Sequence, residues 1–378
     1  MEIKSAYENE EVRPSGFLRI FCLDTTLTLL ILLLCAVGLA ILFSASNFNA
    51  DYVMSQGKKI VVGFILMTLV AMMPPDLLKR LTPIIFIGGV ILLLLIFVIG
   101  LEIKGARRWI NFYIFKFQPS EIMKLATPLM VAYFLDRFNL PRSFTSLVVA
   151  LTLIAIPFML VLIQPDLGTA LIIAYSGVAV LFLGGLYWRY IIITALILAV
   201  SLPAFWAFGM KPYQKDRVIT LINPESDPLG KGYQIIQSKI AIGSGGTYGK
   251  GWQNSTQASL QFLPESTTDF IFAITAEEFG LMGSGLLLLT YLLIIYRSIF
   301  ITLKARDDFY RLIGGTICLY FFFNIFVNIG MVSGILPIVG IPLPFISYGG
   351  TSIVTLFVSF GILMNIYSNP LPKRKRIE

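Results

Sequence analysis

The chain has 378 residues, of which 57% are hydrophobic and 13% charged, and this balance excludes a soluble globular domain of that length. The mean hydropathy of +0.83 and the formal net charge of +8 predict a membrane protein with basic segments outside the bilayer. Because the chain contains no histidine, proton transfer near neutral pH would need a carboxylate, lysine, tyrosine or cysteine. Cys22, Cys35 and Cys318 have no ligand or disulfide spacing, so neither a zinc site nor a disulfide framework is expected.

Apolar runs of about 20 residues predict membrane-spanning helices. Seven runs are long and uninterrupted, and three shorter or more charged ones are needed to keep polar loops on alternate sides. In chain order, the predicted spans are 25–44, 57–74, 81–101, 121–138, 144–163, 167–187, 190–210, 269–296, 312–333 and 351–367. The expected fold class is an all-α polytopic membrane protein with ten transmembrane helices, in which residues 1–378 form a single integral membrane domain.

The distribution of basic residues predicts that both termini are cytoplasmic. The first apolar run is too long for a cleaved signal peptide, so residues 1–20 are expected to remain as a cytoplasmic segment. More than half of the 29 Lys and Arg then lie inside, including the basic tail 368–378, as the positive-inside rule requires. External basic charge is concentrated in 104–124 and 211–250. At 104–124 we expect binding of an anionic headgroup, with a solvated loop as the alternative.

The longest connection, 211–267, joins the seventh and eighth predicted spans. It is rich in Gly, Pro, Ser, Asn and Gln, with apolar islands such as Ile235-Ile236. Connections of this length are usually functional or disordered, and the interleaved apolar residues favour an ordered cap on the external face.

Ionisable side chains at membrane depth are candidate functional residues. Glu121 and Lys124 are three residues apart on one predicted helix, and a structural ion pair is the favoured interpretation. Asp166 precedes the sixth span and is expected to cap its first turn. Glu277 and Glu278 lie on adjacent helix faces, so at least one needs a polar partner inside the bundle, and both are interpreted as structural.

Asp269 stands where the long external loop returns to the membrane. A lipid-linked substrate would place its sugar at this level, and partial burial there could raise the pKa of a carboxylate enough to make it a useful base. Helix capping is the alternative role. Further on, the Pro- and Gly-rich segment 340–352 opens the last predicted span. Its backbone amides could receive an anion, and a tight turn packed against neighbouring helices explains its composition equally well.

Several motifs occur together in one order, and the chain resembles the SEDS (shape, elongation, division, sporulation) family from its first span to its last. Pro342-Leu343-Pro344-Phe345 makes it most similar to the RodA branch. The motifs are Lys104-Gly105-Ala106-Arg107-Arg108-Trp109-Ile110, Phe117-Gln118-Pro119-Ser120-Glu121, Gln164-Pro165-Asp166-Leu167-Gly168, Asp227-Pro228-Leu229-Gly230, Gly232-Tyr233-Gln234, Gln237-Ser238-Lys239-Ile240-Ala241-Ile242-Gly243-Ser244-Gly245-Gly246, and Phe262-Leu263-Pro264-Glu265 before Thr268-Asp269-Phe270-Ile271-Phe272.

The resemblance implies an inner-membrane peptidoglycan glycosyltransferase that polymerises lipid II for cell elongation. Asp269 matches the family's essential aspartate and would be the general base of a single inverting displacement. Lys116, Arg107, Arg108 and Lys239 are candidates to hold the pyrophosphate. Trp109 would either stack on a sugar or anchor its loop at the membrane interface, and Gln257 would contact the substrate. Glu121, Lys124 and Asp166 are supporting residues. Lys116 replaces a frequent arginine, and Ser255-Thr256-Gln257 replaces a frequent Gly-Thr-Gln.

The resemblance also implies partners and leaves alternatives open. A class B penicillin-binding protein would supply the transpeptidase, alongside other elongation-complex proteins and membrane lipid, and no nucleic acid partner is expected. A divalent cation could assist, although no ligand cluster indicates one. The alternative functions are a lipid II flippase or transporter, and a non-catalytic scaffold for cell-wall enzymes. A scaffold should tolerate Asp269→Ala.

Overall fold

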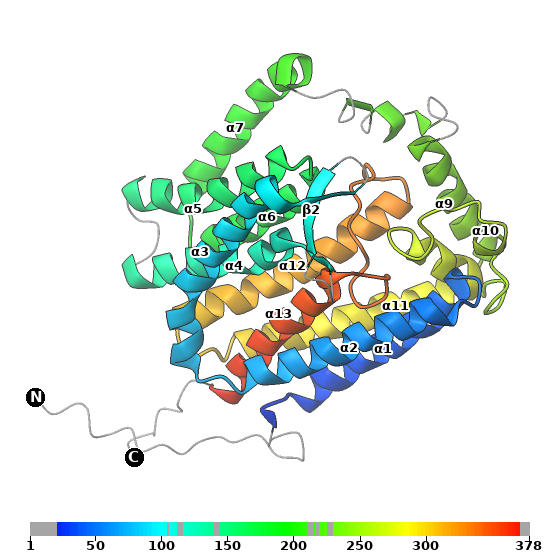
Figure 1. The fold of residues 1–378 in the computed structure, drawn as a ribbon, viewed down its shortest axis with the longest axis horizontal. Coiled ribbons are helices and arrows are strands. Elements are labelled where there is room, and N and C mark those ends of the chain that lie inside the picture. Colours follow the sequence, from blue (N-terminus) through cyan, green and yellow to red (C-terminus); the bar gives the residue numbers. More distant parts are fainter. Residues whose placement is uncertain are drawn as a thin grey trace, which may run out of the picture.

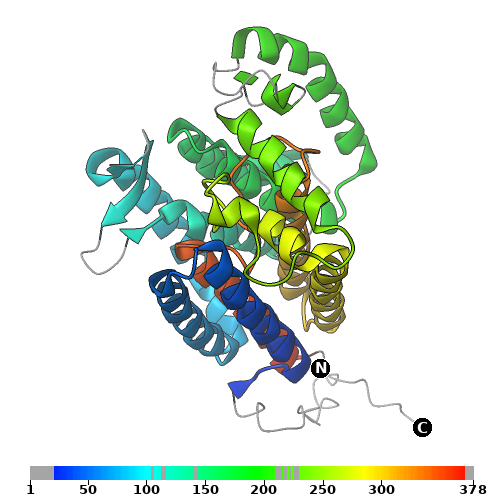
Figure 2. The same cartoon turned by 90° about the vertical axis from the view of Figure 1, so that its right-hand side faces the viewer.

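The computed structural model describes residues 21–103, 106–111, 116–138, 144–209, 215–216, 219–221, 223–224 and 230–370. Long helices lie side by side in a bundle, and α9 and α10 lie at one end of α1, α2 and α11 (Figures 1 and 2). Both views show α7 projecting from the bundle (Figures 1 and 2). The segments 1–20 and 371–378, the motif start at Lys104 and part of the loop 211–267 lie outside the described residues.

Ten helices correspond in order to the ten predicted spans. They are α1 (Thr25–Ala45), α2 (Ala50–Ala71), α3 (Pro75–Ile99), α4 (Pro119–Phe138), α5 (Phe144–Ile163), α6 (Leu167–Leu183), α7 (Trp188–Ala204), α11 (Ile271–Thr302), α12 (Asp308–Val332) and α13 (Thr351–Ser368). Within the described part of the chain, seven of them, α1, α2, α3, α5, α11, α12 and α13, are long and apolar enough to cross a membrane. The chain is therefore a multi-pass membrane protein.

The other three helices are shorter or more charged, so ten membrane crossings remain a prediction. Helices α6 and α7 have 17 residues each, and α7 continues into the π-helix η2 (Phe205–Gly209). Helix α4 carries charged residues near both of its ends, among them Glu121, Lys124 and Arg137.

Helices α2 and α3 begin earlier than the predicted spans at 57 and 81. Asn49 caps α2 by accepting a hydrogen bond from the Asp51 amide, and Pro75 stands in the first turn of α3. The prediction was based on apolar runs, and the first turns of both helices contain polar residues, so the predicted spans began too late. Lys58 and Lys59 consequently lie within α2 and not at its start.

Helix α11 is broken at Gly280, whose φ of 64° is outside the helical range. The loop after α9 (Lys231–Gly245) supplies hydrogen bonds there: the Leu281 and Met282 amides donate to carbonyls of this loop, and the carbonyls of Glu277 and Glu278 accept from it. Side chains from 270 to 278 are buried, whereas exposed apolar ones begin at Leu281. The lipid-facing part of α11 thus starts later than the predicted 269–296, and the helix ends six residues beyond it.

A small antiparallel sheet, which was not predicted, lies between α3 and α4. Its strands are β1 (Leu101–Ile103), β2 (Ala106–Asn111) and β3 (Lys116–Phe117), in the order β1-β2-β3. The register places Leu101 opposite Trp109 and Ile110 opposite Phe117. These strands are too short and too rich in charge to give a readable alternation of apolar residues. The basic segment 104–124 therefore includes a β-hairpin that positions Arg108 and Trp109.

Candidate functional site

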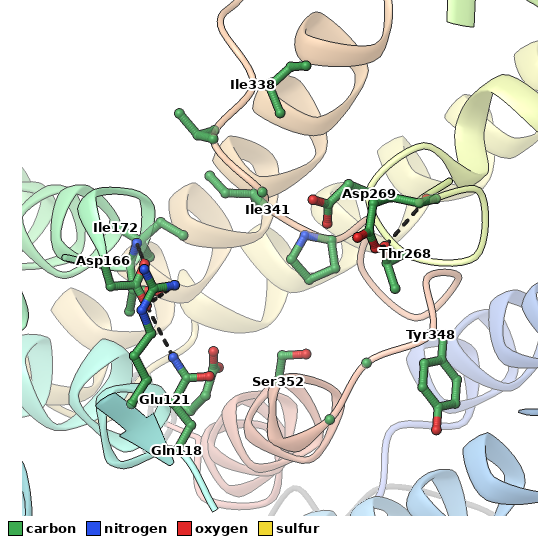
Figure 3. Close-up of a pocket in the computed structure, with 18 of the residues that line it drawn as sticks. Gln118, Glu121, Asp166, Ile172, Thr268, Asp269, Ile338, Ile341, Tyr348 and Ser352 are labelled. Carbon is green, nitrogen blue, oxygen red and sulfur yellow. Dashed lines mark hydrogen bonds and ion pairs between the residues drawn. The ribbon is translucent and has the colours of Figure 1, made fainter. Parts of the chain in front are cut away.

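A cavity of about 670 Å³ opens among β2, the first turns of α4, α6 and α13, α9, and the segments 264–269 and 338–350. Its lining includes Arg108, Trp109, Glu121, Lys124, Asp166 and Asp269, which the sequence had singled out. Figure 3 shows Asp269 on one side of the cavity, and Asp166 and Glu121 on the facing side. Residues as far apart in the chain as Arg108 and Ser352 therefore share one site.

The first wall of the cavity carries the predicted ion pair of α4. The Lys124 Nζ lies 2.6 Å from the Glu121 Oε1, and both side chains are buried. The other Glu121 carboxylate oxygen, Oε2, is buried without a hydrogen-bond partner among the described residues. The ion pair is confirmed, and because it lines the cavity it also contributes to the site.

Asp166 is confirmed as the N-cap of α6, because its Oδ1 accepts from the Thr169 amide at 3.2 Å. Its Oδ2 accepts from the Gln118 side chain at 3.3 Å and lies 3.7 Å from Arg108 Nη1. Arg108 also donates to the carbonyls of Gln164 and Pro165. These contacts fasten the hairpin strand β2 to the start of α6, and they place Arg108 at the cavity.

On the second wall, Asp269 precedes α11, whose N-cap position belongs to Phe270. Its main-chain carbonyl accepts a hydrogen bond from the Asn328 Nδ2 at 2.9 Å, and the same Nδ2 lies 2.7 Å from the Ile341 carbonyl. Gly340 has a φ of 75°, and a Cβ built there would lie 3.3 Å from the Asp269 Oδ2. Because glycine has no Cβ, it does not crowd the Asp269 carboxylate.

The segment 340–352 forms a tight turn packed against neighbouring segments, which was one of its two interpretations. Ser347 Oγ donates to the Thr268 carbonyl at 2.6 Å, and the Tyr348 amide donates to the Thr267 carbonyl at 2.8 Å. From α2, the Gln56 side chain donates to the Ser347 carbonyl and accepts from the Gly349 amide. The turn thereby fixes the main chain just before Asp269. The start of α13 lines the cavity, and anion binding there remains a prediction.

The remaining predicted site residues lie at different distances from the cavity. Trp109 lines it and approaches Gly350, where a built Cβ would lie 3.4 Å from the indole ring. Arg107 is exposed and lies 3.5 Å from Glu102. Lys239 is exposed and packs against Gly334. Lys116 pairs with Asn111 in the sheet, but its side chain lies outside the described part.

Gln257 belongs to the short helix α10 (Thr256–Ser259) and is buried beside Glu277. Its main-chain amide donates to the Glu277 carboxylate at 3.4 Å. Glu277 also accepts from Lys250, Ser255 and Thr256, at 2.5 to 2.6 Å from their side chains. Glu278 is bonded to Ser44 of α1. The prediction that at least one of these glutamates has a polar partner inside the bundle is confirmed. Glu277 joins the segment 250–257 to α11, and Glu278 joins α1 to α11.

Sequence reasoning missed several residues that line the cavity, including Glu265, Gln118, Tyr233 and Tyr348. Glu265 stands four residues before Asp269 and accepts from Thr268 Oγ1 at 2.9 Å. Spacing alone could have suggested Glu265 as a second carboxylate of the site. Tyr348 carried no signal, because a tyrosine in a Pro- and Gly-rich turn is unremarkable.

The comparisons with known proteins identify the family. Residues 24–370 match the cell cycle protein family of FtsW, RodA and SpoVE. The chain belongs to this family. It is 47% identical over 347 residues to the peptidoglycan glycosyltransferase MrdB of Escherichia coli K12, covering 92% of this chain and 94% of that one.

Two solved structures are similar to the fold. One, described as structural coordination of polymerization and crosslinking by a peptidoglycan synthase complex, matches with a TM-score of 0.81 and 30% identity, covering 93% of this chain and 99% of the other. The other is the crystal structure of the Thermus thermophilus rod shape determining protein RodA, with a TM-score of 0.69 and 26% identity, covering 92% and 97%. The SEDS resemblance is confirmed over nearly the whole chain.

Proposed function

We propose that this chain is a peptidoglycan glycosyltransferase that polymerises lipid II into glycan strands during cell elongation. The observation that carries the proposal is the cavity, where Asp269 faces the charged group of Arg108, Glu121, Lys124 and Asp166. The 47% identical Escherichia coli relative is itself named a peptidoglycan glycosyltransferase. Membership of the family and the position of the aspartate thus support the same activity.

In the proposed reaction, Asp269 removes the proton from the 4-hydroxyl of the acceptor N-acetylglucosamine. The hydroxyl oxygen attacks the anomeric carbon at the lipid-linked end of the growing glycan, and the bond to the pyrophosphate oxygen breaks with inversion. Undecaprenyl pyrophosphate leaves with the bonding electron pair. The hydrogen bond from Asn328 to the Asp269 carbonyl supports this role, because a general base must be held within reach of the proton it takes.

The leaving pyrophosphate needs cationic neutralisation. The position of Arg108 at the cavity supports a direct contact with the pyrophosphate. Arg107 lies beside Glu102 and Lys239 lies beside Gly334, and neither lines the cavity. Trp109 would stack on a sugar ring. Dependence on a divalent cation stays a prediction, which chelation with EDTA tests.

We further propose an inner-membrane location with both termini cytoplasmic. Basic residues gather at the bundle end where α3, α11 and α12 begin or finish, and Lys79, Arg297 and Arg306 make ion pairs there with Asp136, Asp24 and Asp76. This arrangement supports a cytoplasmic assignment for that end. Similarity to a chain of a peptidoglycan synthase complex supports a class B penicillin-binding protein as partner.

The test is polymer formation from purified lipid II by the protein bound to its class B partner. Wild type should form glycan polymer, and Asp269→Asn should slow it by about a hundredfold or more, the usual contribution of a general base. Equal polymer from both would remove Asp269 from the mechanism. Polymer from neither, with the partner shown to be bound, would favour the flippase or scaffold.

A further inference from the structure

The charged side chains around the cavity leave it formally acidic. Among the described residues, its lining contains four carboxylates, on Glu121, Asp166, Glu265 and Asp269, and two cations. Both cations already contact carboxylates: Lys124 lies 2.6 Å from Glu121, and Arg108 lies 3.7 Å from Asp166. A lipid-linked pyrophosphate therefore meets an excess of negative charge, and its binding calls for a cation at the rim of the cavity.

Lys59 lies on α2 beside Tyr348, which is one of the residues that line the cavity. It is half-buried and stands nine residues after the helix start at Ala50, which is about 13 Å along the helix axis. A half-buried lysine in a membrane-spanning helix is costly, and lysines of this kind mark substrate paths or find polar partners. Among the described residues, Lys59 makes no ion pair with a carboxylate, and its Nζ lies 3.9 Å from the ring centroid of Tyr348.

Tyr348 connects Lys59 with the reaction site. Tyr348 is among the residues that line the cavity. Its ring packs edge-on against Tyr52, its hydroxyl lies 3.1 Å from Ser55 Oγ, and its main-chain amide donates a hydrogen bond to the Thr267 carbonyl. Burial raises the pKa of Tyr348, but hydrogen bonds from Ser55 and Lys59 and the charge of Lys59 outweigh it and hold the pKa below its usual value. Figure 3 places Tyr348 at the edge of the cavity across from Asp166.

The neighbouring Lys58 provides the contrast. It is exposed on the face of α2 that also exposes Met54, Val61 and Ile65, where a lysine extends its amine toward the headgroups. Lys59 instead turns toward the loop that carries Tyr348. Two adjacent lysines of one helix thus differ in surroundings, and only Lys59 adjoins the wall of the cavity.

We propose that Lys59, on its platform of Tyr348 and Ser55, binds the diphosphate headgroup of a lipid-linked substrate at the membrane rim of the cavity. The proposal rests on the glycosyltransferase function proposed above. A polymerase that joins two lipid-linked sugars must hold two diphosphates. Asp166 and Glu121, which contact the cations Arg108 and Lys124, lie across the cavity from Tyr348. Lys59 supplies a second positive charge for the substrate on the α2 side.

The test compares initial polymerisation rates across lipid II concentrations in phosphatidylcholine vesicles, with the protein bound to its class B partner. Lys59→Met should raise the lipid II concentration for half-maximal rate about tenfold, as the loss of one charge-assisted contact would, and leave the maximal rate within about twofold. Lys59→Arg should retain wild-type behaviour, and Lys58→Met is the matched control. An unchanged half-maximal concentration in Lys59→Met, or an equal shift in both Met variants, would overturn the proposal.

Two further measurements decide the source of the phosphate and guard against misfolding. If the shift in Lys59→Met is seen only when phosphatidylglycerol is added to the vesicles, the ligand is bulk phospholipid and the proposal fails. Equilibrium binding of radiolabelled undecaprenyl diphosphate should weaken about tenfold in Lys59→Met protein that still binds its partner. This binding difference would survive even if wild type formed no polymer, so the failure of the proposed function is distinguishable from failure of the Lys59 site.

Discussion

The two walls of the cavity are held by different kinds of interaction. On the α4 and α6 wall, charged side chains hold one another, as Lys124 holds Glu121 and Arg108 contacts Asp166. On the Asp269 wall, neutral side chains hold the main chain, through hydrogen bonds from Asn328 and Ser347 to carbonyls at or next to the aspartate. The α4 and α6 wall thus contains charged side chains that are already paired, and the Asp269 wall contains a main chain whose position is fixed by hydrogen bonds.

This difference teaches how one membrane site can serve two needs. A buried charge without a partner is unstable in a low-dielectric bundle, so the charges of the first wall are paired even without substrate. A base has to keep its position through each reaction cycle, and hydrogen bonds to the main chain at Asp269 can hold that position. Substitutions in the buried Glu121–Lys124 pair should therefore change mainly stability, and those that release the main chain at Asp269 should change mainly turnover.

The largest effect on stability is expected for Lys124→Met. The substitution leaves the buried Glu121 carboxylate without its counter-ion, and breaking a buried pair in this way costs about 3–5 kcal/mol of unfolding free energy. Unfolding in mixed micelles with increasing dodecyl sulfate measures it. The double variant Glu121→Gln with Lys124→Met should recover most of the loss. If the single variant proves as stable as wild type, the prediction is wrong.

Asn328→Ala should act mainly on turnover. Without the Nδ2 donor, the carbonyls of Asp269 and Ile341 lose their hydrogen bonds, which is worth about 1–3 kcal/mol, and the maximal polymerisation rate should fall about tenfold. The half-maximal lipid II concentration should stay constant. Asn324→Ala is the control, because that side chain donates to Tyr320 of its own helix. Equal rates in both variants would argue against main-chain anchoring of Asp269.

The smallest effect is expected for Arg107→Ala. Its guanidinium and the Glu102 carboxylate are both more than half exposed and 3.5 Å apart, so removing the pair should change stability by about 0–1 kcal/mol. Polymerisation should stay within about twofold of wild type, whereas Arg108→Ala, one residue on, should lose more. The measurement is the rate of polymerisation from lipid II in both variants. A severe loss in Arg107→Ala alone would show that Arg107 contacts the substrate.

The sequence allowed much of the fold to be predicted, because apolar runs and ionisable residues inside them are strong signals in a membrane protein. The pairing of Glu121 with Lys124 and the cap by Asp166 followed from local spacing. The hairpin strand β2 and the break at Gly280 did not, since short strands and helix breaks depend on contacts with distant segments. The contribution of Gln56, Asn328 and Ser347 was invisible for the same reason.

The broken helix α11 has a consequence for reading mutational tolerance. A Cβ at Gly280 would lie 2.4 Å from the Gly249 nitrogen, one at Gly249 would lie 2.1 Å from the Glu278 carbonyl oxygen, and one at Gly245 would lie 2.0 Å from the Ala276 oxygen. Substituting any of the three would force the loop off the helix, although none of them lines the cavity. In a saturation screen for growth, substitutions of these glycines would be as severe as substitutions of Asp269. Intolerance to substitution alone would therefore not distinguish a catalytic residue from a residue that packs the loop against α11.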